Sequence, residues 1–263
     1  MSSVKGFSNF ILNEDKVGSF YNDELNPKFW DKYRTKDGKE EWVFDRIVRK
    51  KLLKIAEDFY EKYEDLLGDL PISDIQLTGS LANYNYSDKS DLDVHVLVDF
   101  NKIKSKKEIV KAAVDGIRFV WNLRHDVIIR GHDVEVYLQD IHEPHTASGL
   151  YSLMNDKWIR KPKFDPPEVD EHDVRKKFDG FASEINQMES KLVTSSSLPD
   201  NAKEMYKRLL RVKEKIQKMR KDDLSKNGEF SVGNLAFKML RNEGYIGKII
   251  DLISKAYSRI YSE

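Results

Sequence analysis

A short stretch in the first third of the chain holds the residue types that bind metal ions and phosphate. Gly79 and Ser80 follow a short strand-like segment, and ten residues separate Ser80 from Asp91. Asp91 and Asp93 alternate with apolar residues, which is the period of a β-strand and directs both carboxylates to one face. Two carboxylates this close repel each other unless a cation lies between them. All-oxygen ligation favours Mg²⁺ or Mn²⁺ over zinc, so the stretch predicts a magnesium or manganese site.

The loop that precedes the aspartates has features that suit an anion. Gly79 lets the backbone approach a phosphate closely, and Ser80 offers a hydroxyl and an amide as donors. Ser90, directly before Asp91, either binds phosphate or caps the turn. We therefore predict that the loop holds a triphosphate beside the metal site, an arrangement that supports in-line attack at phosphorus.

A third acid is expected from a neighbouring strand. Glu135 lies between two valines in a second strand-like segment, as Asp93 lies between two apolar residues in the first. Asp133 lies two residues earlier and shares the same face of that strand. We predict Glu135 as the third carboxylate and keep Asp133 as the alternative. His142 and His145 follow this strand but lack a third nearby ligand in the sequence, so we predict no metal role for them.

The surrounding patterns predict the elements that position these residues. Apolar spacings of three and four indicate amphipathic helices over 44–67 and 105–123. Two strand-like segments within 127–138 flank a glycine-containing turn, which is typical of a β-hairpin. Residues 1–44 and 144–167 look mostly irregular, but the aromatic residues of the first segment indicate an arm that packs on the rest of the protein.

From about residue 168 the strand signals stop and helical patterns take over. Three apolar stripes with helical spacing, and a shorter fourth segment over 232–241, predict an all-α bundle. The expected fold class is therefore α+β, with a small mixed sheet flanked by helices and followed by the bundle. The expected domains are an N-terminal packed arm (1–44), a core that carries the acids (45–167) and a C-terminal helical domain (168–263).

Composition excludes several classes of function. The 45 basic and 45 acidic residues cancel, so the chain as a whole is not a generic polyanion binder. There is no cysteine, which excludes disulfides, thiolate zinc sites and cysteine nucleophiles. Neither a membrane span nor a signal peptide is recognisable, so we expect no membrane partner and a cytoplasmic location.

One segment departs from this charge balance. Lys203–Lys221 holds nine basic and two acidic residues, a local sum of +7. Such a face could contact the phosphate backbone of RNA or another nucleic acid. The alternative is a solvated helix whose basic face pairs with the acidic segment 168–173 at the start of the preceding helix.

The ordered pattern of Gly79-Ser80, a spacer, Asp91-x-Asp93 and a distant acid resembles the DNA polymerase β-like nucleotidyltransferase superfamily. The spacing is similar to that of poly(A) polymerases and cyclic-oligonucleotide synthases. The resemblance implies that the Gly-Ser loop holds the triphosphate and that the three acids hold the metals. It also places Ser87 where these enzymes often carry a loop threonine, so the implied nucleotide-binding residues are Gly79, Ser80, Ser87 and Ser90.

A narrower resemblance covers most of the chain. Segments 25–30, 77–100 and 234–241 look like uncharacterised bacteriophage nucleotidyltransferase-like proteins, which implies a location in the host cytoplasm. The implied reaction is Mg²⁺-dependent transfer of a nucleoside monophosphate from an NTP, with ATP expected first, and release of pyrophosphate. The acceptor stays open among an RNA 3′ end, a protein and a small molecule. The alternative is an inactive module of the same fold that acts as a nucleotide- or nucleic-acid-binding adaptor.

Overall fold

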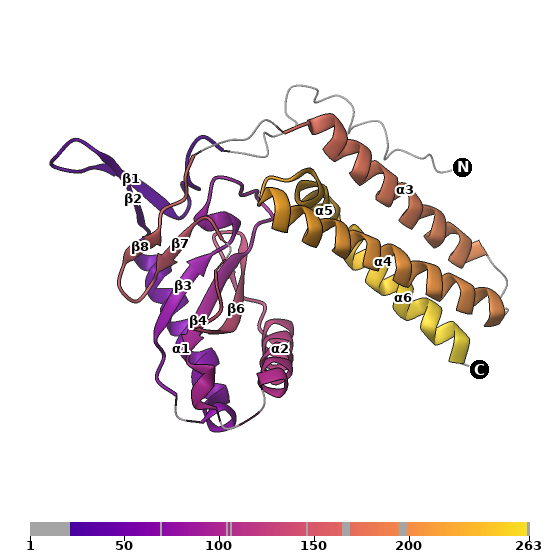
Figure 1. The fold of residues 1–263 in the computed structure, drawn as a ribbon, viewed down its shortest axis with the longest axis horizontal. Coiled ribbons are helices and arrows are strands. Elements are labelled where there is room, and N and C mark those ends of the chain that lie inside the picture. The colour runs from indigo at the N-terminus through magenta and orange to yellow at the C-terminus, as the bar shows by residue number, and fades with distance from the viewer. Residues whose placement is uncertain are drawn as a thin grey trace. The chain divides into compact units, whose positions relative to one another are not determined.

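The computed structural model describes residues 22–261 except 69, 104, 106, 146, 165–168 and 195–198. The aromatic residues of the predicted arm that precede residue 22 lie outside this part. The predicted boundary between the core and the helical domain, at residues 167 and 168, lies outside it as well. The chain divides into two compact units, residues 1–165 and 166–263. The predicted α+β fold class is confirmed, because a mixed sheet occupies the first unit and helices form the second (Figure 1).

The sheet of the first unit brings distant segments of the chain side by side. Its strand order is β5-β6-β4-β3-β7-β8. The strands are β3 (Asp74–Thr78), β4 (Leu92–Val98), β5 (Ile128–Ile129), β6 (His132–Asp140), β7 (Leu150–Ser152) and β8 (Lys157–Arg160). Within this sheet β4 and β6 run parallel, whereas the other neighbouring strands run antiparallel. The expected hairpin is present as β5 and β6, with positive φ angles at Arg130 and Gly131 in its turn.

Helices cover one face and one edge of this sheet. The helix α1 (Arg46–Leu67) and the helix α2 (Lys107–Arg124) pack their apolar stripes on the alternate, buried residues of β4 and β6. The Asn122 side chain of α2 also forms hydrogen bonds with the N–H and the C=O of Val136, at 3.1 and 3.3 Å. These two backbone groups of β6 are thereby paired by a side chain rather than by another strand. Because side chains alternate along a strand, Asp93 and Glu135 project from the opposite face.

Two predicted irregular segments contain strands, which corrects the sequence analysis. A separate hairpin forms from β1 (Trp30–Arg34) and β2 (Glu40–Phe44) within residues 1–44, and β7 and β8 form within 144–167. These strands span three to five residues, and β1 is exposed beyond Trp30, so no apolar alternation marks them. Tertiary packing holds them instead: the buried Trp30 ring stacks on Trp158 at 4.5 Å between centroids.

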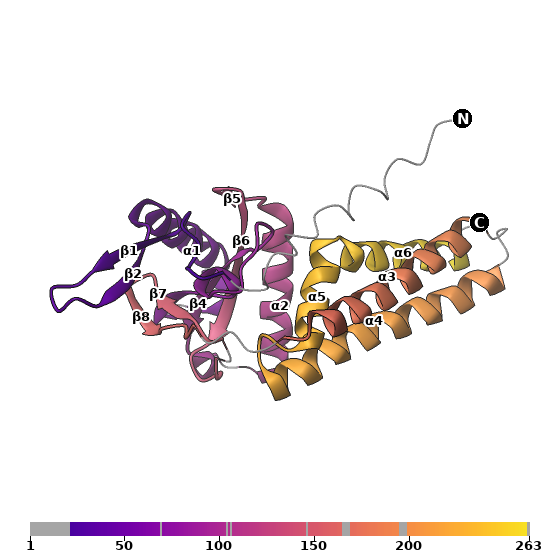
Figure 2. The same cartoon turned by 90° about the horizontal axis from the view of Figure 1, so that it is seen from above.

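The second unit consists of the four predicted helices. They are α3 (Glu171–Thr194), α4 (Pro199–Asn227), α5 (Val232–Asn242) and α6 (Tyr245–Tyr261). Figure 2 shows α3, α4 and α6 running side by side. Their apolar stripes meet in a core of their own, which includes Ile185, Leu209 and Ile249. Within the described residues, every helix is too short or too polar to cross a lipid bilayer.

Candidate active site

The end of β3 and the start of β4 place a carboxylate directly over a glycine. Thr78 and Asp93 are cross-strand partners, and Gly79 leaves the strand with φ +76°. A Cβ at residue 79 would overlap Oδ2 of Asp93, so that only glycine leaves room for this carboxylate. The Asp93 side chain therefore lies against the backbone of the Gly-Ser loop, as the predicted arrangement of metal and phosphate sites requires.

The three serines of the loop come together. Ser80 Oγ bonds Ser90 Oγ at 2.8 Å, and the backbone N–H of Ser87 donates to Ser90 Oγ at 2.9 Å. Ser90 is buried, and its carbonyl oxygen is 2.7 Å from Nδ1 of the buried His132. Ser90 thus ties the loop together, which favours the turn-capping role over direct phosphate contact. Ser80 and Ser87 are only partly buried and remain at the surface of the loop.

The parallel pairing of β4 and β6 sets the third acid. Asp93 is in register with Glu135, and both side chains are partly buried. Asp133 is exposed and pairs with Ile128 in the neighbouring hairpin. Of the two alternatives, Glu135 is therefore the acid that lies beside Asp93, while Asp91 lies in the turn immediately before β4.

Tyr137 forms a hydrogen bond with Glu135, and the sequence analysis did not single it out. The Tyr137 hydroxyl donates a hydrogen bond to Glu135 Oε2. Burial raises the pKa of Tyr137 far above its usual value, and the negative charges of Asp93 and Glu135 raise it further. Tyr137 thus stays a protonated donor at any physiological pH. Its position two residues after Glu135, on the same face of a strand, was the available signal.

Neutral rings continue this face beyond the acids. The His95 ring stacks on Tyr137 at 4.8 Å between centroids, and His95 Nδ1 is 2.6 Å from Gln139 Oε1. Burial lowers the pKa of His95 to about 4, so this histidine is uncharged at neutral pH. Burial also lowers the pKa of His145, whose ring lies 5.3 Å from His95. Its buried Nε2 has no hydrogen-bond partner in the described part of the chain.

The three predicted acids do not form a compact group of ligand atoms. Among the described residues, Asp91, Asp93 and Glu135 do not bring one oxygen each within 4.8 Å of one another. One of the Glu135 oxygens accepts a hydrogen bond from the Tyr137 hydroxyl. The donors nevertheless fit Mg²⁺ or Mn²⁺, since all are carboxylate oxygens on neighbouring strands around a loop of small residues.

A different group of ligand atoms gathers at the far ends of the same strands. Asp99, Asp140 and His142 bring one ligand atom each within 4.8 Å of one another. Sequence reasoning missed this group because Asp99 reaches the other two only through the parallel pairing of Val98 with Asp140. Asp140 Oδ1 accepts the backbone N–H groups of Phe100 and His142, each at 3.3 Å. The group thus already has a structural role in organising the two turns.

The basic segment forms part of α4. Its apolar stripe is buried in the core of the second unit, whereas most of its lysines and arginines are exposed. The alternative was that this basic face forms salt bridges with the acidic start of α3. Among the described residues, no salt bridge joins Lys207, Lys215 or Lys218 to residues 169–173. An ion pair between α3 and α4 joins Lys177 and Asp223 instead, with the charges reversed.

No protein family, curated protein or solved structure matches this chain. What the site does must therefore be inferred from its own residues and their geometry.

Proposed function

We propose that the first unit is a metal-dependent nucleotidyltransferase that moves a nucleoside monophosphate from an NTP, ATP first, to an acceptor hydroxyl. The observation that carries the proposal is the position of Asp93. Its carboxylate lies over the backbone of Gly79 and in register with Glu135, so that an acidic pair adjoins a serine-lined glycine loop. Neither feature alone is specific, but a metal-bridged triphosphate needs both on one surface.

Each residue has a defined part in this reaction. Gly79 gives the triphosphate close access to the backbone, and the Ser80 hydroxyl exchanges its hydrogen bond to Ser90 Oγ for one to the triphosphate. Asp91, Asp93 and Glu135 hold Mg²⁺ or Mn²⁺, which when bound neutralises the triphosphate and lowers the pKa of the acceptor hydroxyl. The acceptor oxygen forms a bond to the α-phosphorus while the bond to the β-phosphate oxygen breaks. Pyrophosphate leaves, and the hydroxyl proton passes to solvent, a transfer that the negative charge of Glu135 favours.

Tyr137 contributes by position. As a permanently protonated donor, it orients the Glu135 carboxylate on the face that Asp93 shares. The neutral rings of His95 and His145 add no positive charge that would compete with a cation.

Incubation with α-labelled NTPs and Mg²⁺, alone and with RNA or a cell extract, tests the reaction. Asp93→Asn should reduce label transfer and pyrophosphate release by about 10³-fold or more, because a neutral amide no longer stabilises the metals. The fold should survive, and relief of carboxylate repulsion should leave the metal-free stability unchanged or about 1 kcal/mol higher. Asp115→Asn, at an exposed position of α2, makes the same chemical change away from the site and should retain wild-type transfer.

The third acid is tested in the same assay. Glu135→Gln should impair transfer severely, whereas Asp133→Asn should have an effect of less than about threefold, since Asp133 is exposed and is not the residue in register with Asp93. The reverse order would assign the third acid to Asp133. If Mg²⁺ and NTP stabilise the protein against heat but no acceptor or condition yields transfer, the chain is the non-catalytic binding module instead.

A further inference from the structure

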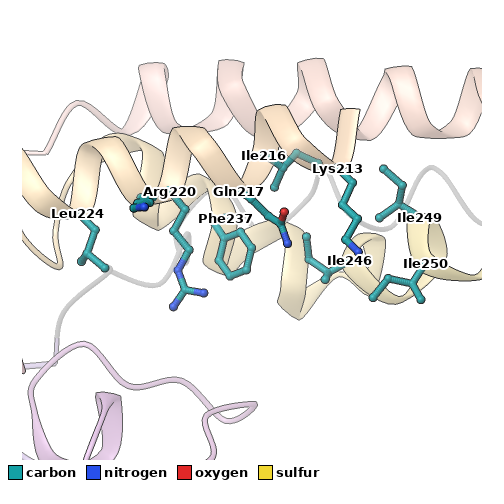
Figure 3. A pocket seen from close by; sticks show the side chains of 10 residues that line it. Lys213, Ile216, Gln217, Arg220, Leu224, Phe237, Ile246, Ile249 and Ile250 are labelled. Carbon is teal, nitrogen blue, oxygen red and sulfur yellow. The ribbon is translucent and has the colours of Figure 1, made fainter. Parts of the chain in front are cut away.

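The second unit contains a pocket that the proposed transfer reaction does not use. It has a volume of about 420 Å³ and lies among α4, α5 and α6 (Figure 3). That volume is within the range of small-molecule sites in proteins. Its interior is aliphatic and aromatic, lined by Ile216, Leu224, Phe237, Ile246, Ile249 and Ile250.

The charged side chains that line this pocket are all basic in the described part of the chain. They are Lys213, Arg220 and Lys221, which lie on one face of α4. Figure 3 shows Phe237 and Ile246 between the side chains of Lys213 and Arg220. The two cations are seven residues apart, which corresponds to about 10 Å along the helix axis. The Arg220 guanidinium lies 4.3 Å from the centroid of the Phe237 ring, so a positive charge adjoins the apolar wall.

We propose that this pocket binds a free amphipathic anion, with an aliphatic tail in the apolar interior and an anionic head group at the lysines. Medium-chain carboxylates have this chemistry. The inference is independent of the proposed transferase site, since every lining residue belongs to the second unit.

The composition of the lining favours an aliphatic tail over a nucleic-acid base. Gln217 is the uncharged polar residue of the lining, so a buried base would lose most of the hydrogen bonds that its polar edge makes in water. An aliphatic tail has no such groups and gains free energy in proportion to the apolar area that it buries. The basic side chains of the lining, which we call the basic rim (Lys213, Arg220 and Lys221), then favour anionic over cationic head groups.

Isothermal titration with octanoate, decanoate and dodecanoate, each below its micelle concentration, measures the binding. We expect one molecule per chain and an affinity that rises about tenfold for every two methylenes that become buried. Decyltrimethylammonium, which has the same tail and the opposite charge, should bind at least about tenfold more weakly than decanoate. In methyl NMR spectra, decanoate should shift Ile216, Ile246, Ile249 and Ile250 and leave Ile185 of the helical core unmoved.

A pair of matched double variants separates the rim from general charge effects. Lys213→Gln with Lys221→Gln should weaken decanoate binding about fivefold or more. Lys207→Gln with Lys215→Gln removes the same charge from exposed positions of α4 outside the pocket, and binding should stay within about twofold of wild type. Ile250→Trp, at a half-exposed pocket position, should abolish binding while the circular dichroism of the helices is retained.

Three results would overturn the proposal. The first is equal affinity for the cationic and anionic amphiphiles, and the second is an equal loss in both lysine pairs. The third is absence of decanoate binding. In that case, binding of phosphatidylglycerol vesicles or of single-stranded RNA is compared between the wild type and the Lys213/Lys221 double variant. Weaker binding by the variant would identify a membrane surface or a polynucleotide as the ligand instead.

Discussion

At Gly79 the backbone adopts φ +76°, and the Asp93 carboxylate occupies the space that a side chain would need. Two separate costs therefore oppose substitution at this residue. One is the backbone conformation, φ +76° with ψ −163°, which is essentially confined to glycine and costs another residue about 1–3 kcal/mol. The other is overlap with a charged group that the strand pairing of Asp93 holds in place.

Gly79→Ala should lower the free energy of unfolding by about 2–6 kcal/mol, the sum of the conformational cost and the overlap. Denaturant unfolding provides the measurement. Gly38 is a control for the positive φ angle alone, because it has φ +83° but nothing within 4 Å of an added Cβ. Gly38→Ala should cost only about 1–2 kcal/mol, and equal losses at the two positions would show that Asp93 can move aside.

His95 makes stability depend on pH at the same face. Its pKa is lowered from 6.5 to about 4 in the folded protein, so the unfolded chain binds the proton more tightly. Between these values the unfolded state carries more protons, and the free energy of unfolding must rise with pH. The contribution is fully present above about pH 6.5 and is lost as the pH falls toward 4, with a total of about 3 kcal/mol.

His95→Gln removes this titration and keeps a polar side chain beside Gln139. The difference in unfolding free energy between wild type and the variant, measured from pH 4 to 7, should grow with pH and level off near pH 6.5. Effects of pH that do not involve residue 95 are common to the two proteins and cancel in that difference. A pH-independent difference would mean that His95 is not buried as a neutral ring.

Among the elements, α4 carries two faces with different tasks. Leu209, Val212 and Ile216 are buried in the helical core, whereas Lys207, Arg211, Lys215 and Lys218 are exposed. Because the two sets do not overlap, the charge of the exposed face can be changed while the helix keeps its packing.

If the acceptor is a polynucleotide, replacing Lys207, Arg211, Lys215 and Lys218 with Gln should raise the apparent KM for the acceptor and leave that for NTP unchanged. Binding of the unaltered protein should weaken with salt by about 0.9 log units per log unit of salt for each duplex phosphate neutralised, or about 0.7 for single strands. The variant should show a smaller slope. If the salt slope of the variant equals that of the wild type with every acceptor tested, the basic face does not contact the acceptor. A protein or small-molecule acceptor would then be favoured.

On the scale of the whole molecule, the two units have separate hydrophobic cores that share no buried residue. The four tryptophans, Trp30, Trp42, Trp121 and Trp158, all lie in the first unit. Tryptophan fluorescence therefore reports on the unfolding of the sheet unit, while the far-ultraviolet circular dichroism signal contains the helices of both.

Leu209→Ala should destabilise the helical unit by about 3 kcal/mol, since Leu209 is fully buried in its core. We expect the denaturant midpoint by circular dichroism to fall and the midpoint by tryptophan fluorescence to move much less. Leu52→Ala, at an equally buried position of α1, serves as the converse control and should lower the fluorescence midpoint. Coincident shifts in both signals for both variants would show that the two units unfold as one cooperative block.

Local sequence patterns determined the long elements. The spacing of apolar residues predicted α1, α2 and the four helices of the second unit, because a helix must bury one stripe of its surface. The alternation in β4 and in β6 was equally visible, since each strand buries one face. The ordered Gly79-Ser80 and Asp91-x-Asp93 pattern also came from sequence alone, and its metal and nucleotide roles stay predictions.

Tertiary structure decided what depends on contacts between distant segments. Parallel pairing of β4 with β6 selected Glu135 over Asp133 as the neighbour of Asp93, and it placed Tyr137 beside His95. The short strands β1, β2, β7 and β8 formed without a periodic signal because rings from distant segments pack together, as Trp30 of β1 does on Trp158 of β8. The pocket of the helical unit likewise needs three helices at once. Register, burial and cavities arise from non-local packing, which a local pattern of residues does not encode.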